Sequence, residues 1–151
     1  MRKRSFKYKK QVHIAACILF ILYIAALIYV LFFLETRSET YHNVNLVPFK
    51  TLRMLFKYYF TYHHFTPWYW FSNLFGNILL LAPFGLLLPL LRHHRMNLWS
   101  ILLLAILFSV VIEAAQYLTG VGEADIDDVI LNTLGALLGY GIYRFLGALY
   151  Q

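Results

Sequence analysis

The sequence has little charge for its length: 13% of its 151 residues are charged, and seven are acidic. A soluble domain usually has about 25% charged residues, so this chain lacks the polar surface that such a domain needs. Its single cysteine, Cys17, excludes a disulfide framework within one chain. Zinc-binding, helix-turn-helix and RNA-binding patterns are also missing, so we expect no nucleic-acid partner. With 61% hydrophobic residues, the composition indicates a membrane protein.

Four apolar runs are each long enough to cross a bilayer, at about 1.5 Å per helical residue. They cover approximately residues 12–34, 72–91, 98–118 and 127–149. The second run contains Pro83 and Pro89, which bend a helix but are tolerated where neighbouring helices pack around the bend. The sequence therefore predicts an all-α integral membrane protein, a bundle of four transmembrane helices.

The first apolar run follows a strongly basic segment, which holds six of the thirteen Lys and Arg residues in its first ten positions. A signal peptide has a similar start, but this run is longer than a usual signal sequence and no small-residue cleavage site follows it. We expect an uncleaved anchor, with residues 1–11 as a basic tail and residues 12–151 as one transmembrane domain. Because Arg92 and Arg95 follow the second span, the positive-inside rule places both chain ends in the cytoplasm.

The longest connection, residues 35–71, contains the aromatic-rich stretch MLFKYYFTYHHFTPWYWF. Tyrosine and tryptophan rings suit the headgroup layer of a membrane. Two local structures fit this part: a short interfacial helix across Lys50–Thr61, or a loop packed on the helix ends. Either way, we expect an aromatic-rich outer loop at the membrane interface.

Polar side chains occur near the outer ends of the second, third and fourth spans. With the predicted topology, they all lie within about 10 Å of the outer surface. They are Asn73 and Asn77, then Glu113 and Gln116, then Asp127, Asp128 and Asn132. Asn73 and Asn77 are four residues apart, Glu113 and Gln116 three, and Asp128 and Asn132 four, so the members of each pair share one helix face. The pattern predicts a single polar pocket on the outer side.

Helix capping is the simplest explanation for acids at Asp125 and Asp127, because a carboxylate accepts N–H bonds at a helix N-terminus. Capping does not explain Glu113, which lies near a helix C-terminus, where the helix dipole disfavours an anion. Ionisable groups inside a span indicate a functional site. Gly135 and Gly139 continue the polar face of the fourth span and predict close helix packing.

Four motifs of this chain resemble those of the VanZ-like family, small bacterial membrane proteins named for a teicoplanin-resistance protein. They are NLVPF (45–49), NILLLAPFG (77–85), IEAAQY (112–117) and DIDDVILNTLGALLGY (125–140), in the family's order. The resemblance implies a multi-pass protein of the bacterial plasma membrane. It places the family's polar positions on Asn45, Asn77, Glu113, Gln116, Asp125, Asp128 and Asn132. Many members have a basic residue just before the first aspartate of the last motif. This chain has Gly122 and Glu123 there, so we expect a more acidic site.

Three functions fit these observations. The first is a non-enzymatic module whose acidic pocket binds an amphipathic envelope molecule and gives tolerance to lipoglycopeptides such as teicoplanin. The bound molecule would be the antibiotic, a lipid-linked cell-wall precursor, or a membrane lipid with a divalent cation bridging it to the acids. The second is an intramembrane enzyme that acts on a lipid-linked precursor, with carboxylates as acid–base groups or Mg²⁺ ligands. The third is a structural partner in a membrane complex.

The sequence disfavours the enzyme because no nucleophile is paired with a base. The predicted topology also puts His63 and His64 on the opposite side of the membrane from His93 and His94. We therefore predict the binding module, with no resident cofactor.

Overall fold

The computed structural model describes residues 2–34, 43–57, 60, 67–92 and 96–149. Within these ranges the side chains of residues 2–9, 34 and 67–73 are not described. The side chain of Asn73, predicted to line the pocket, therefore lies outside the described part, as do the histidine pairs 63–64 and 93–94.

The described part of the chain consists almost entirely of α-helices, with one short pair of strands. The elements are α1 (Arg2–Tyr29), a π-helical turn (Val30–Leu34), β1 (Val44–Asn45), α2 (Lys50–Lys57), α3 (Pro67–Leu91), α4 (Leu98–Thr119), β2 (Ala124–Asp125) and α5 (Ile126–Leu149). Four stretches are long and apolar enough to cross a membrane: Lys10–Phe33, Leu74–Leu91, Leu98–Thr119 and Ile126–Leu149. The prediction of an all-α membrane protein with four spans is confirmed.

Two helices begin well before the apolar runs that predicted them. Helix α1 starts at Arg2 and includes most of the basic tail, and α3 starts at Pro67, a residue favoured in the first turn of a helix. A hydropathy pattern marks only the apolar part of a helix. The backbone hydrogen bonds of a helix form within the helix itself, so it can continue into polar sequence outside the apolar run. Of the two local structures that fitted Lys50–Thr61, a short helix or a packed loop, the structure has a helix over Lys50–Lys57, α2.

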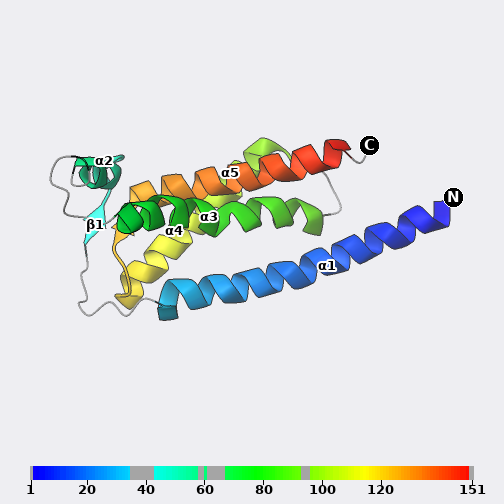
Figure 1. Ribbon diagram of the computed structural model, residues 1–151. Helices are drawn as coiled ribbons and strands as arrows, with labels where there is room; N and C mark the ends of the chain where they lie inside the picture. Colours follow the sequence, from blue (N-terminus) through cyan, green and yellow to red (C-terminus); the bar gives the residue numbers. More distant parts are fainter. Residues whose placement is uncertain (1, 35–42, 58–59, 61–66, 93–95, 150–151) are drawn as a thin grey trace.

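The bundle has α3 and α5 at its centre (Figure 1). Helix α1 runs along one side of α3, and α4 slants across α3 and α5 from behind. The strand β1 and helix α2 lie at one end of the bundle, and both chain ends lie at the other. The acidic segment before α5 is therefore brought to the same end as the long connection.

Glycines bring α3 and α5 into backbone contact. A Cβ atom added at Gly135 would lie 1.9 Å from the carbonyl oxygen of Ile78, and one at Gly139 would lie 1.9 Å from that of Ala82. From the other side, a Cβ atom at Gly85 would lie 1.8 Å from the carbonyl oxygen of Ala136. Small residues of this kind let transmembrane helices approach closely, and dispersion contacts then stabilise the pair.

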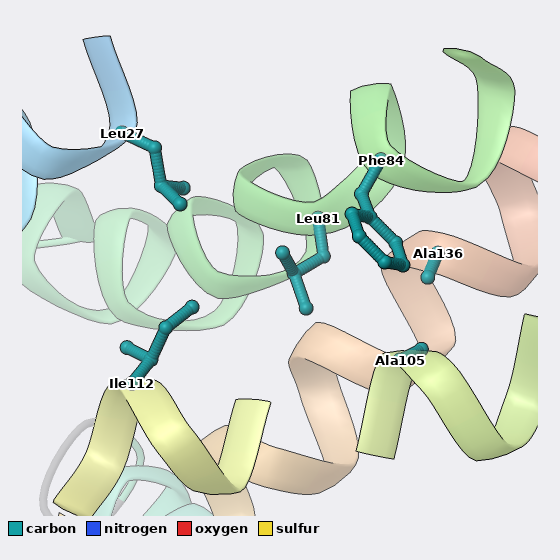
Figure 2. Packing of buried hydrophobic residues seen from close by; sticks show 6 residues of the cluster. All are labelled: Leu27, Leu81, Phe84, Ala105, Ile112 and Ala136. Carbon is teal, nitrogen blue, oxygen red and sulfur yellow. The ribbon is translucent and has the colours of Figure 1, made fainter. Parts of the chain in front are cut away.

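The apolar core joins all four spans (Figure 2). Its buried residues are Leu27 of α1, Leu81 and Phe84 of α3, Ala105 and Ile112 of α4, and Ala136 of α5. The ring of Phe84 also stacks on Phe108, with centroids 5.0 Å apart. These contacts hold α4 against the α3–α5 pair by side-chain packing.

Helix α1 is attached to α3 by hydrogen bonds from two of its polar side chains. Pro83 has no backbone N–H, and its ring pushes against the preceding turn of α3. In that turn the carbonyl of Leu80 accepts a bond of 2.8 Å from the Tyr23 hydroxyl. Ten residues away along each helix, Nδ1 of His13 lies 3.2 Å from the carbonyl oxygen of Leu90, to which it donates as the Nδ1–H tautomer. The two bonds align α1 antiparallel to α3.

Candidate functional site

A short parallel strand pair brings the first and last motifs together at one end of the bundle. Val44 pairs with Ala124, and Asn45 pairs with Asp125. The amide of Ala124 donates to the carbonyl of Asn43 at 3.2 Å. The sequence analysis predicted no strands, because two residues are too few to show a strand pattern. This pairing makes the long connection part of the polar site.

Asp125 caps α5 and binds the connection with the same carboxylate. Its Oδ1 accepts from the amide of Asp127 at 2.8 Å and from Nδ2 of Asn45 at 2.9 Å. Its Oδ2 accepts from the hydroxyl of Thr51 at 2.5 Å. A carboxylate that accepts an N–H bond at the start of a helix stabilises that helix, which is the role that capping predicts for Asp125.

Asp127 caps a different helix from its own. Its side chain is fully buried, and its two oxygens accept from the backbone amides of Phe49 and Leu52, the second at 3.1 Å. These amides belong to the first turn of α2 and the residue before it. Phe49 has φ 61°, an uncommon value for a residue with a side chain, which costs about 1–3 kcal/mol. The two hydrogen bonds that the Asp127 carboxylate accepts therefore hold the strained turn at Phe49 in place.

Glu113 of α4 lies against the strand β2 and is 6% exposed. Its Oε2 accepts from the amide of Asp125 at 3.1 Å. This bond gives a structural reason for an acid near the C-terminus of α4, where the helix dipole disfavours it. The side chain of Gln116 is half-buried. The backbone carbonyl of Gln116 accepts from the amides of Val121 and Gly122, which closes the turn after α4.

A second set of polar contacts lies deeper in the spans. Asn77 of α3 donates its Nδ2 to Oδ1 of Asp128 on α5. One turn further along α5, Asn132 donates to the hydroxyl of Ser109 on α4 at 2.9 Å. The Oδ1 atom of Asn132 has no hydrogen-bond partner, and neither has the hydroxyl of Thr133. These contacts link α3, α4 and α5 through polar side chains, as expected from residues that avoid lipid.

Apart from Gln116, which bonds through its backbone carbonyl, the predicted polar residues with described side chains fall into two groups. Asn45, Asp125 and Glu113 hold the connection on the bundle, together with Asp127. Asn77, Asp128 and Asn132 link the spans. Sequence reasoning missed Thr51 and Ser109, because an isolated hydroxyl residue is common and gives no periodic signal. Within the described residues, no group of three or more His, Cys, Asp or Glu side chains is arranged to hold a metal ion.

Three of the acids are accessible from outside the bundle. Glu123 is exposed and accepts from Nδ2 of Asn43 at 3.1 Å, while Asp125 and Asp128 are half-buried. Next to them, the connection exposes the apolar side chains of Leu46, Val47 and Phe49. The end of the bundle thus offers negative charge beside an apolar surface.

Comparison with known proteins agrees with these motifs. The family model described as VanZ/LLP1 matches residues 20–147, which include the whole of the second and third spans and most of the first and fourth. Protein VanZ of Enterococcus faecium is 32% identical over 73 residues, a stretch that covers 48% of this chain and 45% of that relative. No solved structure shows a significant match. The family match covers most of the chain and both groups of polar residues, so this chain belongs to the VanZ/LLP1 family.

Proposed function

We propose that this VanZ/LLP1-family membrane protein is a non-enzymatic binding module for an amphipathic molecule of the cell envelope. The binding site is the polar end of the bundle, which we place on the outer face of the plasma membrane. The ligand has an apolar tail and a cationic amine, as a lipoglycopeptide or an amine-bearing lipid-linked cell-wall precursor does. Binding of either gives tolerance to teicoplanin-like antibiotics.

One observation carries this proposal: accessible carboxylates lie beside exposed apolar side chains on a segment held in place. Leu46 is 73% exposed and Val47 is 60% exposed, although both are apolar. They follow Asn45, whose side chain bonds to Asp125 and to the amide of Val47. An exposed apolar patch next to charge is typical of a ligand or membrane contact. A ligand with an apolar tail and an amine would contact the apolar patch with its tail and the carboxylates with its amine.

The buried acids have a supporting role in this proposal. Asp127 accepts a hydrogen bond from the amide of Leu52, and Glu113 accepts one from the amide of Asp125, whose own carboxylate is bonded to Asn45. Directly or through Asp125, both acids hold the segment from Asn45 to Leu52 in place. Such preorganisation of a binding segment reduces the entropy lost on binding. Asp128 is the best candidate for direct contact with the ligand amine, because it is half-buried, lies inside the span and is oriented by Asn77.

The test is antibiotic susceptibility in a sensitive Gram-positive host that expresses the chain at matched membrane levels. Wild type is compared with Asp128→Asn, which removes the charge, and with Asp128→Glu, which keeps it. We expect wild type to raise tolerance to teicoplanin and not to vancomycin, which has no acyl tail. Asp128→Asn should lose this tolerance, and Asp128→Glu should keep part of it.

Binding of teicoplanin and of a lipid-linked precursor to the purified protein in lipid nanodiscs identifies the ligand. If Asp128→Asn no longer binds teicoplanin, or no longer binds the precursor, the molecule that is lost is the ligand of this site. If Asp128→Asn gives the same tolerance and the same binding of both molecules as wild type, the proposal is wrong.

A further inference from the structure

We propose that a groove between α1, α3 and α5 binds one acyl chain of an anionic glycerophospholipid, with the lipid phosphate at Lys10 and Arg92. This groove lies in the middle of the spans, away from the polar end. The proposal therefore stands whether or not the polar end binds a ligand.

The groove exists because α1 packs along α3 and makes few contacts with α5. It has a volume of about 540 Å³, within the range of about 300–1,000 Å³ that is usual for small-molecule sites. One wall is formed by Leu22 and Ala26 of α1, the floor by Pro83 of α3, and the other wall by Gly139 and Ile142 of α5. Ala26 and Gly139 are small, which leaves room between the larger side chains.

The lining of the groove excludes water and polar ligands. Tyr23 is the residue of the lining with a polar side chain, and its hydroxyl is already bonded to the carbonyl of Leu80. A water molecule needs two to four polar partners, which this lining does not offer. The surrounding medium at this depth is hydrocarbon, so an acyl chain from the bilayer is the occupant that matches both shape and polarity.

Exposed basic residues lie where the headgroup of that lipid would be. The contact between His13 and Leu90 shows that the start of the α1 span and the end of α3 are at the same end of the bundle. Lys10 lies nine residues before Leu19 of the groove, and Arg92 lies five residues after Leu87. These separations correspond to about 13 Å and about 7 Å along a helix axis. One leaflet of the hydrocarbon core is about 15 Å thick, so a phosphate at these residues puts its acyl chain beside the groove.

Charge decides which lipid is bound. Lys10 and Arg92 are both exposed, and five more basic residues lie in positions 2–9. A basic residue near the surface favours an anionic lipid by about fivefold in affinity. The groove contacts only the acyl chain and cannot distinguish lipids that differ in their headgroups. Lys10 and Arg92 therefore supply the preference for an anionic headgroup.

Native mass spectrometry of the full chain, purified in detergent with equal amounts of phosphatidylglycerol and phosphatidylcholine, tests the proposal. We expect wild type to retain one phosphatidylglycerol molecule in preference to phosphatidylcholine. Ala26→Phe puts a ring into the groove and should strongly reduce the retained lipid. Ala25→Phe is the matched control, because Ala25 is the adjacent exposed residue of α1 and does not line the groove.

Charge is tested separately from shape. Lys10→Gln and Arg92→Gln should each reduce the preference for phosphatidylglycerol by about fivefold, whereas Lys57→Gln at the opposite end should not change it. Equal retention by Ala26→Phe and Ala25→Phe, when both unfold at the wild-type temperature, would overturn the site. Equal retention of the two lipids by wild type, or preferential retention of an added polyprenyl phosphate, would overturn the assignment of the ligand.

Discussion

Helix α3 contacts two other spans in different ways. Against α5 it makes backbone contact through Gly85, Gly135 and Gly139. Against α1 it makes two side-chain hydrogen bonds and leaves a groove. In the most apolar part of α1 11% of the residues are buried, whereas in that of α5 44% are. Helices α3, α4 and α5 therefore form the packed unit of this protein, and α1 is a more loosely attached span facing lipid.

The largest effect is expected at the α3–α5 contact. Gly135→Leu places a side chain where the carbonyl oxygen of Ile78 lies, and the two helices must separate. We expect the free energy of unfolding to fall by about 3 kcal/mol or more, as for severe overpacking. Thermal unfolding of the purified protein in detergent measures it.

The control for this change is Gly141→Leu, because Gly141 has no neighbouring atoms within 4 Å of an added Cβ. If both variants unfold at the same temperature, close contact between α3 and α5 is not what stabilises the bundle.

A smaller effect is expected where the packed unit holds the long connection between α1 and α3. Asp127→Ala removes both bonds to the start of α2 and leaves the amides of Phe49 and Leu52 without their acceptor. We expect a loss of about 1–2 kcal/mol, as for other helix caps, and the loss should be local to α2. Hydrogen exchange of the Phe49 and Leu52 amides should become faster, while exchange in α3 and α5 should not change.

Glu123→Ala is the matched acidic control, because the exposed side chain of Glu123 bonds to Asn43 and not to α2. If Glu123→Ala speeds exchange at Phe49 and Leu52 as much as Asp127→Ala does, the effect comes from lost charge and not from lost capping.

The smallest effect is expected at the α1–α3 contact. Tyr23→Phe removes the hydroxyl that donates to Leu80. Hydrogen bonds between transmembrane helices contribute about 0.6 kcal/mol on average, so the bundle should stay folded. Disulfide cross-linking between cysteines placed in α1 and α3 should become slower or less specific as α1 moves.

Tyr29→Phe is the control for this change, because Tyr29 is exposed and stacks on Phe33 of the π-helical turn that follows α1. A fall in stability for Tyr23→Phe as large as that for Gly135→Leu would contradict the view that α1 is loosely attached.

Some features of the polar end could be predicted from local pattern alone. An acid at the start of an apolar helix predicts a cap, and Asp125 has this role. The choice of helix that Asp127 caps could not be predicted, because it depends on the path of a connection more than seventy residues earlier in the chain. The same holds for Thr51, whose partner Asp125 is 74 residues away.

The class of this protein and the number of its spans follow from the sequence alone. A bilayer requires apolar helices of a minimum length, and this requirement acts on each segment separately. The sequence also shows that the polar residues of α3, α4 and α5 must avoid lipid. The pairing of the polar residues depends on the folded arrangement: Asn45 meets Asp125, Asn77 meets Asp128, and Ser109 meets Asn132. The physical reason is that these pairings depend on how closely glycines let α3 and α5 approach and on where the connection returns to the bundle. Neither is a property of any single segment.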